Sequence, residues 1–258
     1  MIEAIYSGVI FIATLVGASA GLGGGIIIKP VLDFIGMHDL DTINFLSTCA
    51  VFTMAIYSTI KQIRNKVKFD YLIILLIAIG SVVGGSLGSA IFRFFMDVMN
   101  HNLLKFIQSS ILTILLLIVI VNVNIEHKNL FVKNKAIIVL IGIMLGTISS
   151  FLGIGGGPVN VAVFVLFFSV DIKTATVYSI ATILFSQAST LLTIACTRGF
   201  LIFDLSLLFY VLPMSILGGI VGTKINFKSN AKQITKIFNL VSCFILILSI
   251  YNAIVAIT

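Results

Sequence analysis

Two glycine clusters form the part of this sequence whose residue types and spacing could do chemistry. They repeat one pattern 132 positions apart, with Gly21, Gly23, Gly24 and Gly25 in the first copy and Gly153, Gly155, Gly156 and Gly157 in the second. Each glycine costs a helix about 1 kcal/mol relative to alanine, so both clusters favour unwound backbone inside an apolar stretch. Where a helix restarts after such a break, its free N–H groups and the positive end of its dipole attract anions. Pro158 suits the first turn of a restarted helix. The clusters therefore predict two converging half-sites for a small anion.

Polar side chains near the clusters are candidates to complete these half-sites. Lys29 is the basic residue inside an apolar stretch, four positions after Gly25, and such residues are functional candidates. A Lys29–Asp33 pair with i, i+4 spacing is the structural alternative. Asn160 offers a neutral donor three positions after the second cluster. Hydroxyl and amide side chains follow on the next stretches: Ser47, Thr48, Ser179, Thr182, Ser186 and Gln187. Their alternative is hydrogen bonding to helix carbonyls or across helix contacts.

Other kinds of site fit the sequence poorly. The glycine spacing matches neither a dinucleotide fingerprint nor a phosphate loop. Ser19 resembles the serine of an intramembrane protease, but no later apolar stretch carries a histidine to activate it. The histidines fall in expected loops and the cysteines are odd in number and widely spaced, in a pattern that fits neither a metal site nor a disulfide framework: His38, His101, His127, Cys49, Cys196 and Cys243. We expect no enzyme, no catalytic residue, no metal and no cofactor.

The elements that position these residues are membrane helices. Of the 258 residues, 59% are hydrophobic and 10% charged, with a mean hydropathy of +1.21, which leaves too little polar surface for a soluble globule. Most of the eight apolar stretches reach the ~20 residues of a membrane-spanning helix, and they do not alternate as barrel strands do. They lie at roughly 5–36, 43–60, 71–92, 103–121, 136–169, 175–195, 201–223 and 234–257. The first begins with Glu3 rather than a basic segment, so we interpret it as mature structure and not as a signal peptide.

The sequence contains an internal duplication, in which the second half repeats the pattern of the first. At the offset of 132 the matches include Asp39 with Asp171, Thr42 with Thr174 and Ser47 with Ser179. At an offset of 134 they include Asp70 with Asp204, Ser81 with Ser215, Gly84 and Gly85 with Gly218 and Gly219, and Gly88 with Gly222. The spacing of Gly80, Gly84 and Gly88, and of Gly218 and Gly222, predicts close helix packing. We expect a first transmembrane repeat at 1–122, a linker at 123–135 and a second repeat at 136–258. Glycine-interrupted segments at corresponding positions of a duplicated membrane unit indicate a transporter binding site.

The basic loops indicate that the two repeats are inverted. After the second apolar stretch the first repeat has Lys61, Arg64, Lys66 and Lys68, where the second repeat has only Arg198. One loop later the bias reverses, from Arg93, Asp97 and Lys105 to Lys224, Lys228, Lys232 and Lys236. Cytoplasmic loops concentrate lysine and arginine, so equivalent loops are expected on opposite sides of the membrane.

Inversion requires an odd number of crossings per repeat, so one stretch in each must count twice. The two stretches with the glycine clusters are the candidates, because each is long for one span and short for two. We expect two half-length helices in each, entering and returning on the same side, with about ten crossings in total. The loop 38–41 and both termini then face outward, and the linker, with Lys128, Lys133 and Lys135, faces the cytoplasm. Eight simple crossings with parallel repeats is the alternative.

Charge also limits the partners. Membrane orientation accounts for the net charge of +7, so we expect a lipid bilayer and a small anionic substrate as partners, and no nucleic acid. The acidic residues lie at the ends of stretches or in loops, so no buried carboxylate relay is expected: Asp33, Asp39, Asp41, Asp70, Asp97, Glu126, Asp171 and Asp204. Coupling to an ion through Asp33, coupling through the substrate's own proton and uncoupled transport are all open.

The residues around the clusters resemble the TauE/SafE family of sulfite and organosulfonate exporters. The resemblance lies in the first glycine cluster with the following Ile26-Ile27-Ile28-Lys29-Pro30, and in the second cluster with Pro158, and it covers essentially the whole chain. Ala162 stands at the counterpart of Pro30, and Ile26 at that of Pro158, so the half-sites are expected to differ in shape. The resemblance implies export of a small sulfur-containing anion, such as sulfite, thiosulfate or an organosulfonate, across the plasma membrane of a prokaryote. Alternating access around the two breaks is the expected mechanism; a passive anion channel and a non-transporting scaffold are the alternatives.

Overall fold

The computed structural model describes residues 2–65, 70–124 and 132–257, and this part of the chain is almost entirely helical, without strands. An all-helical backbone suits an apolar chain, because a helix satisfies its N–H and carbonyl groups internally. In chain order the elements are α1 Ile2–Ala20, α2 Gly25–Ile35, α3 Leu40–Arg64, α4 Tyr71–Val98, α5 His101–Asn124, α6 Lys135–Leu152, α7 Gly157–Phe168, α8 Ile172–Thr197, the 3-10 helix η1 Leu205–Leu207, α9 Leu208–Lys228 and α10 Ala231–Val255. The predicted all-α class is confirmed.

The repeated aspartates stand where equivalent helices begin. Asp70 accepts hydrogen bonds from two N–H groups in the first turn of α4, and Asp204 accepts one from Ser206 in η1, just before α9. Asp171 caps α8 in the same way, and Asp39 precedes α3. Such caps satisfy N–H groups that have no partner within the helix. The hydrogen bonds from Ser206 also hold the pKa of the Asp204 carboxyl below its ordinary value.

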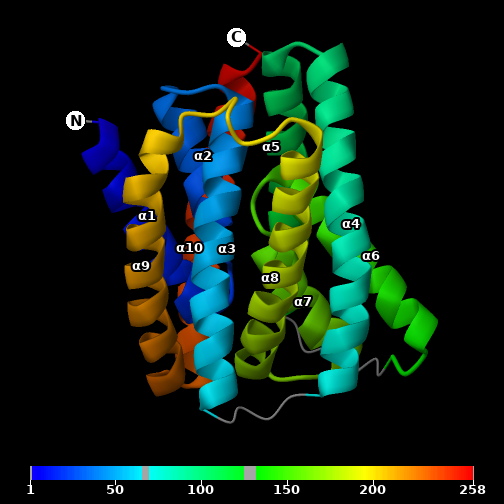
Figure 1. Ribbon diagram of the computed structural model, residues 1–258. Helices are drawn as coiled ribbons and strands as arrows, with labels where there is room; N and C mark the ends of the chain where they lie inside the picture. The colour runs from blue at the N-terminus through cyan, green and yellow to red at the C-terminus, as the bar shows by residue number, and fades with distance from the viewer. Residues whose placement is uncertain (1, 66–69, 125–131, 258) are drawn as a thin grey trace.

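Helices of the second half run opposite to their counterparts in the first half. Figure 1 shows α3 descending from the upper face where α8 ascends to it, and α4 ascending where α9 descends. The same reversal relates α5 to α10, and both ends of the chain lie at the upper face. These directions confirm the predicted inverted arrangement, and the parallel alternative is wrong. The reversed charge bias of the loops predicted the helix directions correctly.

Glycines bring the two halves into close backbone contact. α4 of the first half packs on α6 of the second half, and α9 of the second packs on α1 of the first. A Cβ atom at Gly84 would lie 2.1 Å from the Ile143 carbonyl oxygen, and one at Gly218 would lie 2.6 Å from the Phe11 carbonyl oxygen. These are equivalent positions, and the next turn repeats both contacts. Helices approach this closely where no side chain intervenes. The halves are therefore interleaved rather than side by side.

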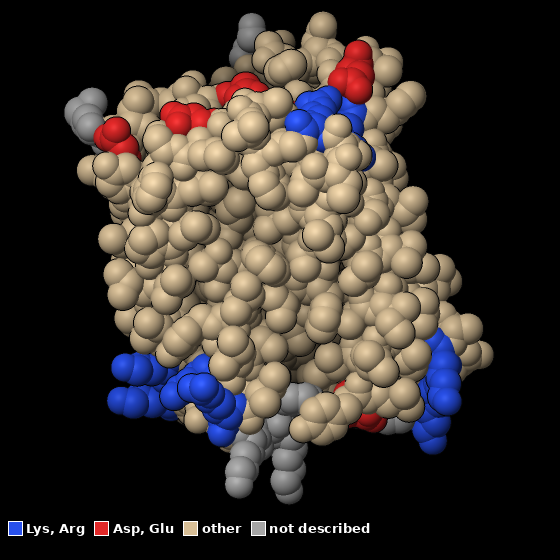
Figure 2. Space-filling model, in the orientation of Figure 1, with Lys and Arg blue, Asp and Glu red and all other residues tan. Residues whose placement is uncertain are grey.

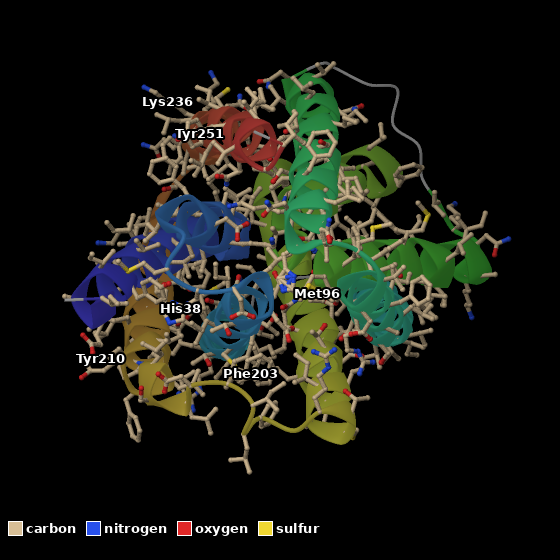
Figure 3. The ribbon with its side chains drawn as sticks, turned by 90° about the horizontal axis from the view of Figure 1, so that it is seen from above. His38, Met96, Phe203, Tyr210, Lys236 and Tyr251 are labelled. Atoms are coloured by element: carbon tan, nitrogen blue, oxygen red, sulfur yellow. The ribbon has the colours of Figure 1, made fainter. Side chains whose placement is uncertain are left out.

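The helices break at the two glycine clusters, but unequally. α1 and α6 have 19 and 18 residues, whereas α2 and α7 have 11 and 12. In the described residues eight helices, α1 and α6 among them, are long and apolar enough to cross a membrane. Seen from above in Figure 3, α1 and α6 are strongly inclined and extend to opposite sides of the molecule. An inclined helix needs more residues to cover a given depth. α2 and α7 have the expected half-length, whereas α1 and α6 are longer than expected.

Charged side chains collect at the two ends of the molecule and leave an uncharged band between them. Figure 2 shows mainly lysine and arginine along the lower edge, with some acidic atoms between them, and acidic side chains with one basic cluster along the upper edge. The lower ends of α3, α6, α9 and α10 carry the basic residues Lys61, Arg64, Lys135, Lys224, Lys228, Lys232 and Lys236. The lysine-rich loops of both repeats thus share one face, as the inverted arrangement requires. The expectations for Lys66, Lys68, Glu126, His127 and Lys128 lie outside the described residues.

Candidate functional site

The two glycine breaks lie back to back in the buried interior. Three glycines of each break have positive φ, which L side chains rarely adopt: Gly21, Gly23 and Gly24, and Gly153, Gly155 and Gly156. A Cβ at Gly25 would lie 2.6 Å from the Ile154 carbonyl oxygen, and one at Gly157 would lie 2.0 Å from that of Leu22. Both restarted helices, α2 and α7, therefore begin against the backbone of the opposite break. In this conformation backbone fills the space between the two helix starts.

One serine joins each break to the other repeat by a hydrogen bond. Ser47 of α3 donates a hydrogen bond of 3.0 Å to the Gly153 carbonyl, and Ser179 of α8 donates one of 2.7 Å to the Gly21 carbonyl. The four residues are paired by the same offset, and both serines are fully buried. A motion that parts the breaks must therefore break or carry along the Ser47 and Ser179 hydrogen bonds.

The other hydroxyl and amide candidates are also buried, and several have partners. Thr182 and Ser186 donate to carbonyls of their own helix, which is the alternative that the sequence leaves open. Gln187 donates to the Ser149 hydroxyl at 3.2 Å. Thr48 lines a pocket described below. Ser149 faces Gly156, so Gln187 is joined to the second break through one intervening side chain.

Lys29 forms the predicted pair with Asp33, but the pair is buried. The Lys29 ammonium lies 3.1 Å from the Asp33 carboxylate and donates to the Gln108 side-chain oxygen at 2.9 Å. Gln108 in turn donates to the Phe151 carbonyl at the end of α6, and Lys105 donates to the Asp33 carbonyl. Asp33 lies at the end of α2 as expected, but it is 6% exposed, so the expectation that no carboxylate is buried is wrong here. Because α2 is short and lies inside the bundle, its last turn packs against α5. There, protein side chains are the hydrogen-bond partners of the pair.

Removing one member of this pair is expected to destabilise the protein strongly. Lys29→Met should lower the free energy of unfolding by about 3–5 kcal/mol, because it leaves the Asp33 carboxylate buried without its cation. The double variant Lys29→Met/Asp33→Leu should recover most of that loss, which thermal unfolding in detergent measures. Lys236→Met, at an exposed position, is the control. Equal losses in the single and double variants would contradict this account.

Two buried asparagines have unpartnered side chains. Asn160, on α7 beside the second break, is 1% exposed, and Asn44, on α3, is 7% exposed. Neither side-chain amide makes a hydrogen bond within the described part of the chain. The Asn160 oxygen would lie 3.2 Å from a Cβ at Gly156, and the Asn44 oxygen 2.2 Å from a Cβ at Gly153. An unpaired buried amide costs about 1–3 kcal/mol, so both side chains stand in an energetically unfavourable state here.

A pocket, here called the upper pocket, opens toward the upper face between α3, α4 and α8. Its volume is about 20 Å³, room for about one water molecule. Its polar lining comes from both repeats and includes Asn44, Thr48, Ser89, Arg93, Ser150 and Thr190. Phe203, labelled in Figure 3, lies on the apolar side of the pocket and stacks on Phe45 near the start of α3, with 4.2 Å between the ring centroids. Arg198 at the rim pairs with Asp41 and Asp97 at 2.9 and 3.2 Å.

The equivalent region at the lower face is closed by hydrogen bonds. Thr223 donates to Ser58 at 2.9 Å, and Asn226 donates to Thr176 at 3.1 Å and to the Ser19 carbonyl at 2.8 Å. By the offsets of the duplication, Ser58 and Thr223 correspond to Thr190 and Ser89. Thr176 and Asn226 correspond in the same way to Asn44 and Phe92. All four counterparts line the upper pocket. Side chains at equivalent positions of the two repeats are thus hydrogen-bonded at the lower face and separated by a pocket at the upper face.

The pattern of the sequence missed three residues of these clusters. Arg93 was expected in the loop after 71–92, but α4 continues to Val98 and presents Arg93 to the upper pocket. Asn44 and Gln108 stand inside apolar stretches, where an amide needs a partner, and that requirement was the available signal. His101, expected in a loop, is the first residue of α5.

A sequence model of the family described as sulfite exporter TauE/SafE matches residues 6–249 of this chain. The matched range includes both glycine breaks and the whole lining of the upper pocket. No curated protein and no solved structure matches the chain.

Proposed function

The chain belongs to the TauE/SafE sulfite exporter family, and on that premise we propose that it is a secondary transporter that exports a small sulfur-containing anion. Sulfite, thiosulfate and short organosulfonates are the candidate substrates. We further propose that it lies in the plasma membrane of a prokaryote with its lysine-rich lower face in the cytoplasm, as the positive-inside rule predicts. The upper pocket then faces outward. The proposed role is transport without covalent chemistry and without a cofactor.

Alternating access is the mechanism that the geometry supports best. The observation that carries it is the pairing of an upper pocket with a hydrogen-bonded lower region at equivalent positions of inverted halves. In inverted-repeat transporters, each half can adopt the conformation of the other. This swap closes the open face and opens the closed one. Here the exchange would join Ser89 to Thr190 above and part Ser58 from Thr223 below.

The glycine breaks have two proposed roles in this cycle. Positive-φ glycines absorb backbone rotation, so the breaks would act as the hinges between α1 and α2 and between α6 and α7. Once parted, they would expose N–H groups at the starts of α2 and α7 to the anion. The unpartnered Asn160 amide beside the second break supports that role. Lys29 would act through its pair with Asp33 as a buried anchor and not as the primary anion ligand.

Counterflow in proteoliposomes tests the proposal. Vesicles preloaded with unlabelled sulfite, thiosulfate, taurine, sulfoacetate, sulfate or acetate are exposed to labelled sulfite or taurine, with protein-free vesicles as the control. We expect saturable uptake that is stimulated only by internal sulfur oxyanions or sulfonates, because alternating access exchanges one bound anion for another. Flux without stimulation by internal anion would indicate a channel. Folded protein that exchanges none of these anions would overturn the proposed function and leave the scaffold alternative.

A further inference from the structure

The upper pocket contains the features of a built anion site and lies beside the second glycine break. Resting on the proposed function, we propose that the transported oxyanion binds in the upper pocket to the Asn44 amide and the Arg93 guanidinium. Asn44 comes from α3 and Arg93 from α4, while Ser150 of α6 and Thr190 of α8 complete the polar wall. The anion would thus be held by side chains of both repeats.

The first argument is the state of the Asn44 amide. It lines the pocket, is 7% exposed and makes no hydrogen bond within the residues described. The equivalent residue, Thr176, is satisfied, since it donates to the Lys173 carbonyl and accepts from Asn226. Since many contacts between the halves are repeated, this difference singles out the upper pocket. A ligand there would remove the cost of the unpaired amide.

The second argument is charge. Arg93 donates to the Ser89 carbonyl of its own helix at 3.3 Å and makes no ion pair in the described part of the chain. Arg198 lines the same pocket, but Asp41 and Asp97 offset its charge. The residue equivalent to Arg93 in the second repeat is Phe227, so the second repeat has no cation at this position. A guanidinium presents several donors and no acceptor, which suits the oxygens of sulfite or a sulfonate.

The third argument is the orientation of the hydroxyls and the link to a break. Thr190 donates to the Ser186 carbonyl at 3.0 Å, so the 2.6 Å contact between Ser150 and Thr190 leaves Ser150 as the donor. These hydroxyls are therefore fixed, and Asn44 and Arg93 supply the unused donors. The Asn44 amide also touches Gly153, and Ser47, one turn along α3, bonds the Gly153 carbonyl. Occupation of the pocket would act directly on the second break.

The present volume of about 20 Å³ is too small for the anion, so binding requires the pocket to widen. Arg198 bridges the ends of α8, α3 and α4 at the rim through Asp41 and Asp97. Ion pairs that are at least partly exposed are worth about 1 kcal/mol or less, so they hold the rim without locking it. The structure is thus a nearly closed form of the site.

A fluorescence titration tests the proposal separately from transport. The chain has no tryptophan, so Phe203→Trp places a single reporter in the lining of the pocket. Protein in detergent is titrated with sodium sulfite and with taurine at constant ionic strength. We expect a saturable signal, with the Kd raised about 10- to 100-fold by Asn44→Thr and by Arg93→Gln in the reporter background. Thr is the residue of the equivalent position, so the first variant is compatible with the fold. Arg64→Gln, at the lower face, is the matched control and should leave the Kd unchanged.

The outcomes separate the site from the function. The absence of a saturable signal with either anion would overturn the site even if counterflow succeeds. The site would also be overturned if Asn44→Thr and Arg93→Gln had the same Kd as the control Arg64→Gln. A signal that depends on Asn44 and Arg93 without counterflow would support the site while the transport proposal fails.

Discussion

Gly157→Ala is expected to abolish anion exchange and to lower the thermal stability of the protein. The added Cβ would lie 2.0 Å from the Leu22 carbonyl oxygen and 2.1 Å from its carbonyl carbon, a separation that real Cβ atoms do not show. The obstacle is backbone and not the end of a flexible side chain, so one break must move away from the other. Overpacking a buried site usually costs about 1–3 kcal/mol, and a backbone neighbour puts this variant at the upper end or beyond it. Thermal unfolding and counterflow measure the two effects.

Gly8→Ala is the matched control for this prediction. A Cβ at Gly8, in the exposed part of α1, would have no atom within 4 Å. Alanine is the better helix former by about 1 kcal/mol, so this variant should be as stable as the native protein or slightly more so. Native stability together with native exchange in Gly157→Ala would refute the back-to-back contact of the breaks.

A disulfide between positions 58 and 223 is expected to stop exchange completely and reversibly. The two hydroxyl oxygens lie 2.9 Å apart across α3 and α9, so Ser58→Cys/Thr223→Cys places two thiols near bonding geometry. The native Cys49, Cys196 and Cys243 are unpaired and are first replaced by alanine. Oxidation would hold the lower face closed, and counterflow should return when a reductant is added.

Ser89→Cys/Thr190→Cys is the matched pair, because these positions are the counterparts of Thr223 and Ser58. Both line the upper pocket, and no hydrogen bond joins them among the described residues. This pair should cross-link only when anion takes the protein through its cycle. Equal cross-linking of both pairs without anion, and without loss of exchange, would argue against alternating access.

The sequence was sufficient for the topology because its signals are local. Glycine triplets mark where helices break, aspartates mark where they start, and lysines mark one face. It did not reveal that α1 and α6 are longer than α2 and α7, because hydropathy carries no information about the tilt of a helix. The proposed domain boundaries at 122 and 136 stay a prediction.

The candidate site could be predicted less completely, because the hydrogen-bond partners of its buried side chains lie far away in the sequence. Ser47 and Ser179 were found through the duplication, yet their acceptors lie in the opposite repeat. Lys29 drew attention as a cation in an apolar stretch, but its partner Gln108 lies 79 positions away. The amide of Asn44 in an apolar stretch was a signal in the sequence, but only the structure shows that this amide has no partner among the described residues. Whether the sequence-based site residues bind substrate remains for the experiments above.

The interleaving of the halves also bears on how the protein is made. Asn226 bonds the Ser19 carbonyl across 207 positions, and Asn252 bonds the Pro30 carbonyl across 222. During synthesis α1 and α4 therefore enter the bilayer long before α9 and α6 are available to cover their contact faces. Contacts of such large sequence separation form late and slow folding. The first half therefore cannot reach its final packing until the last helices of the chain have been made.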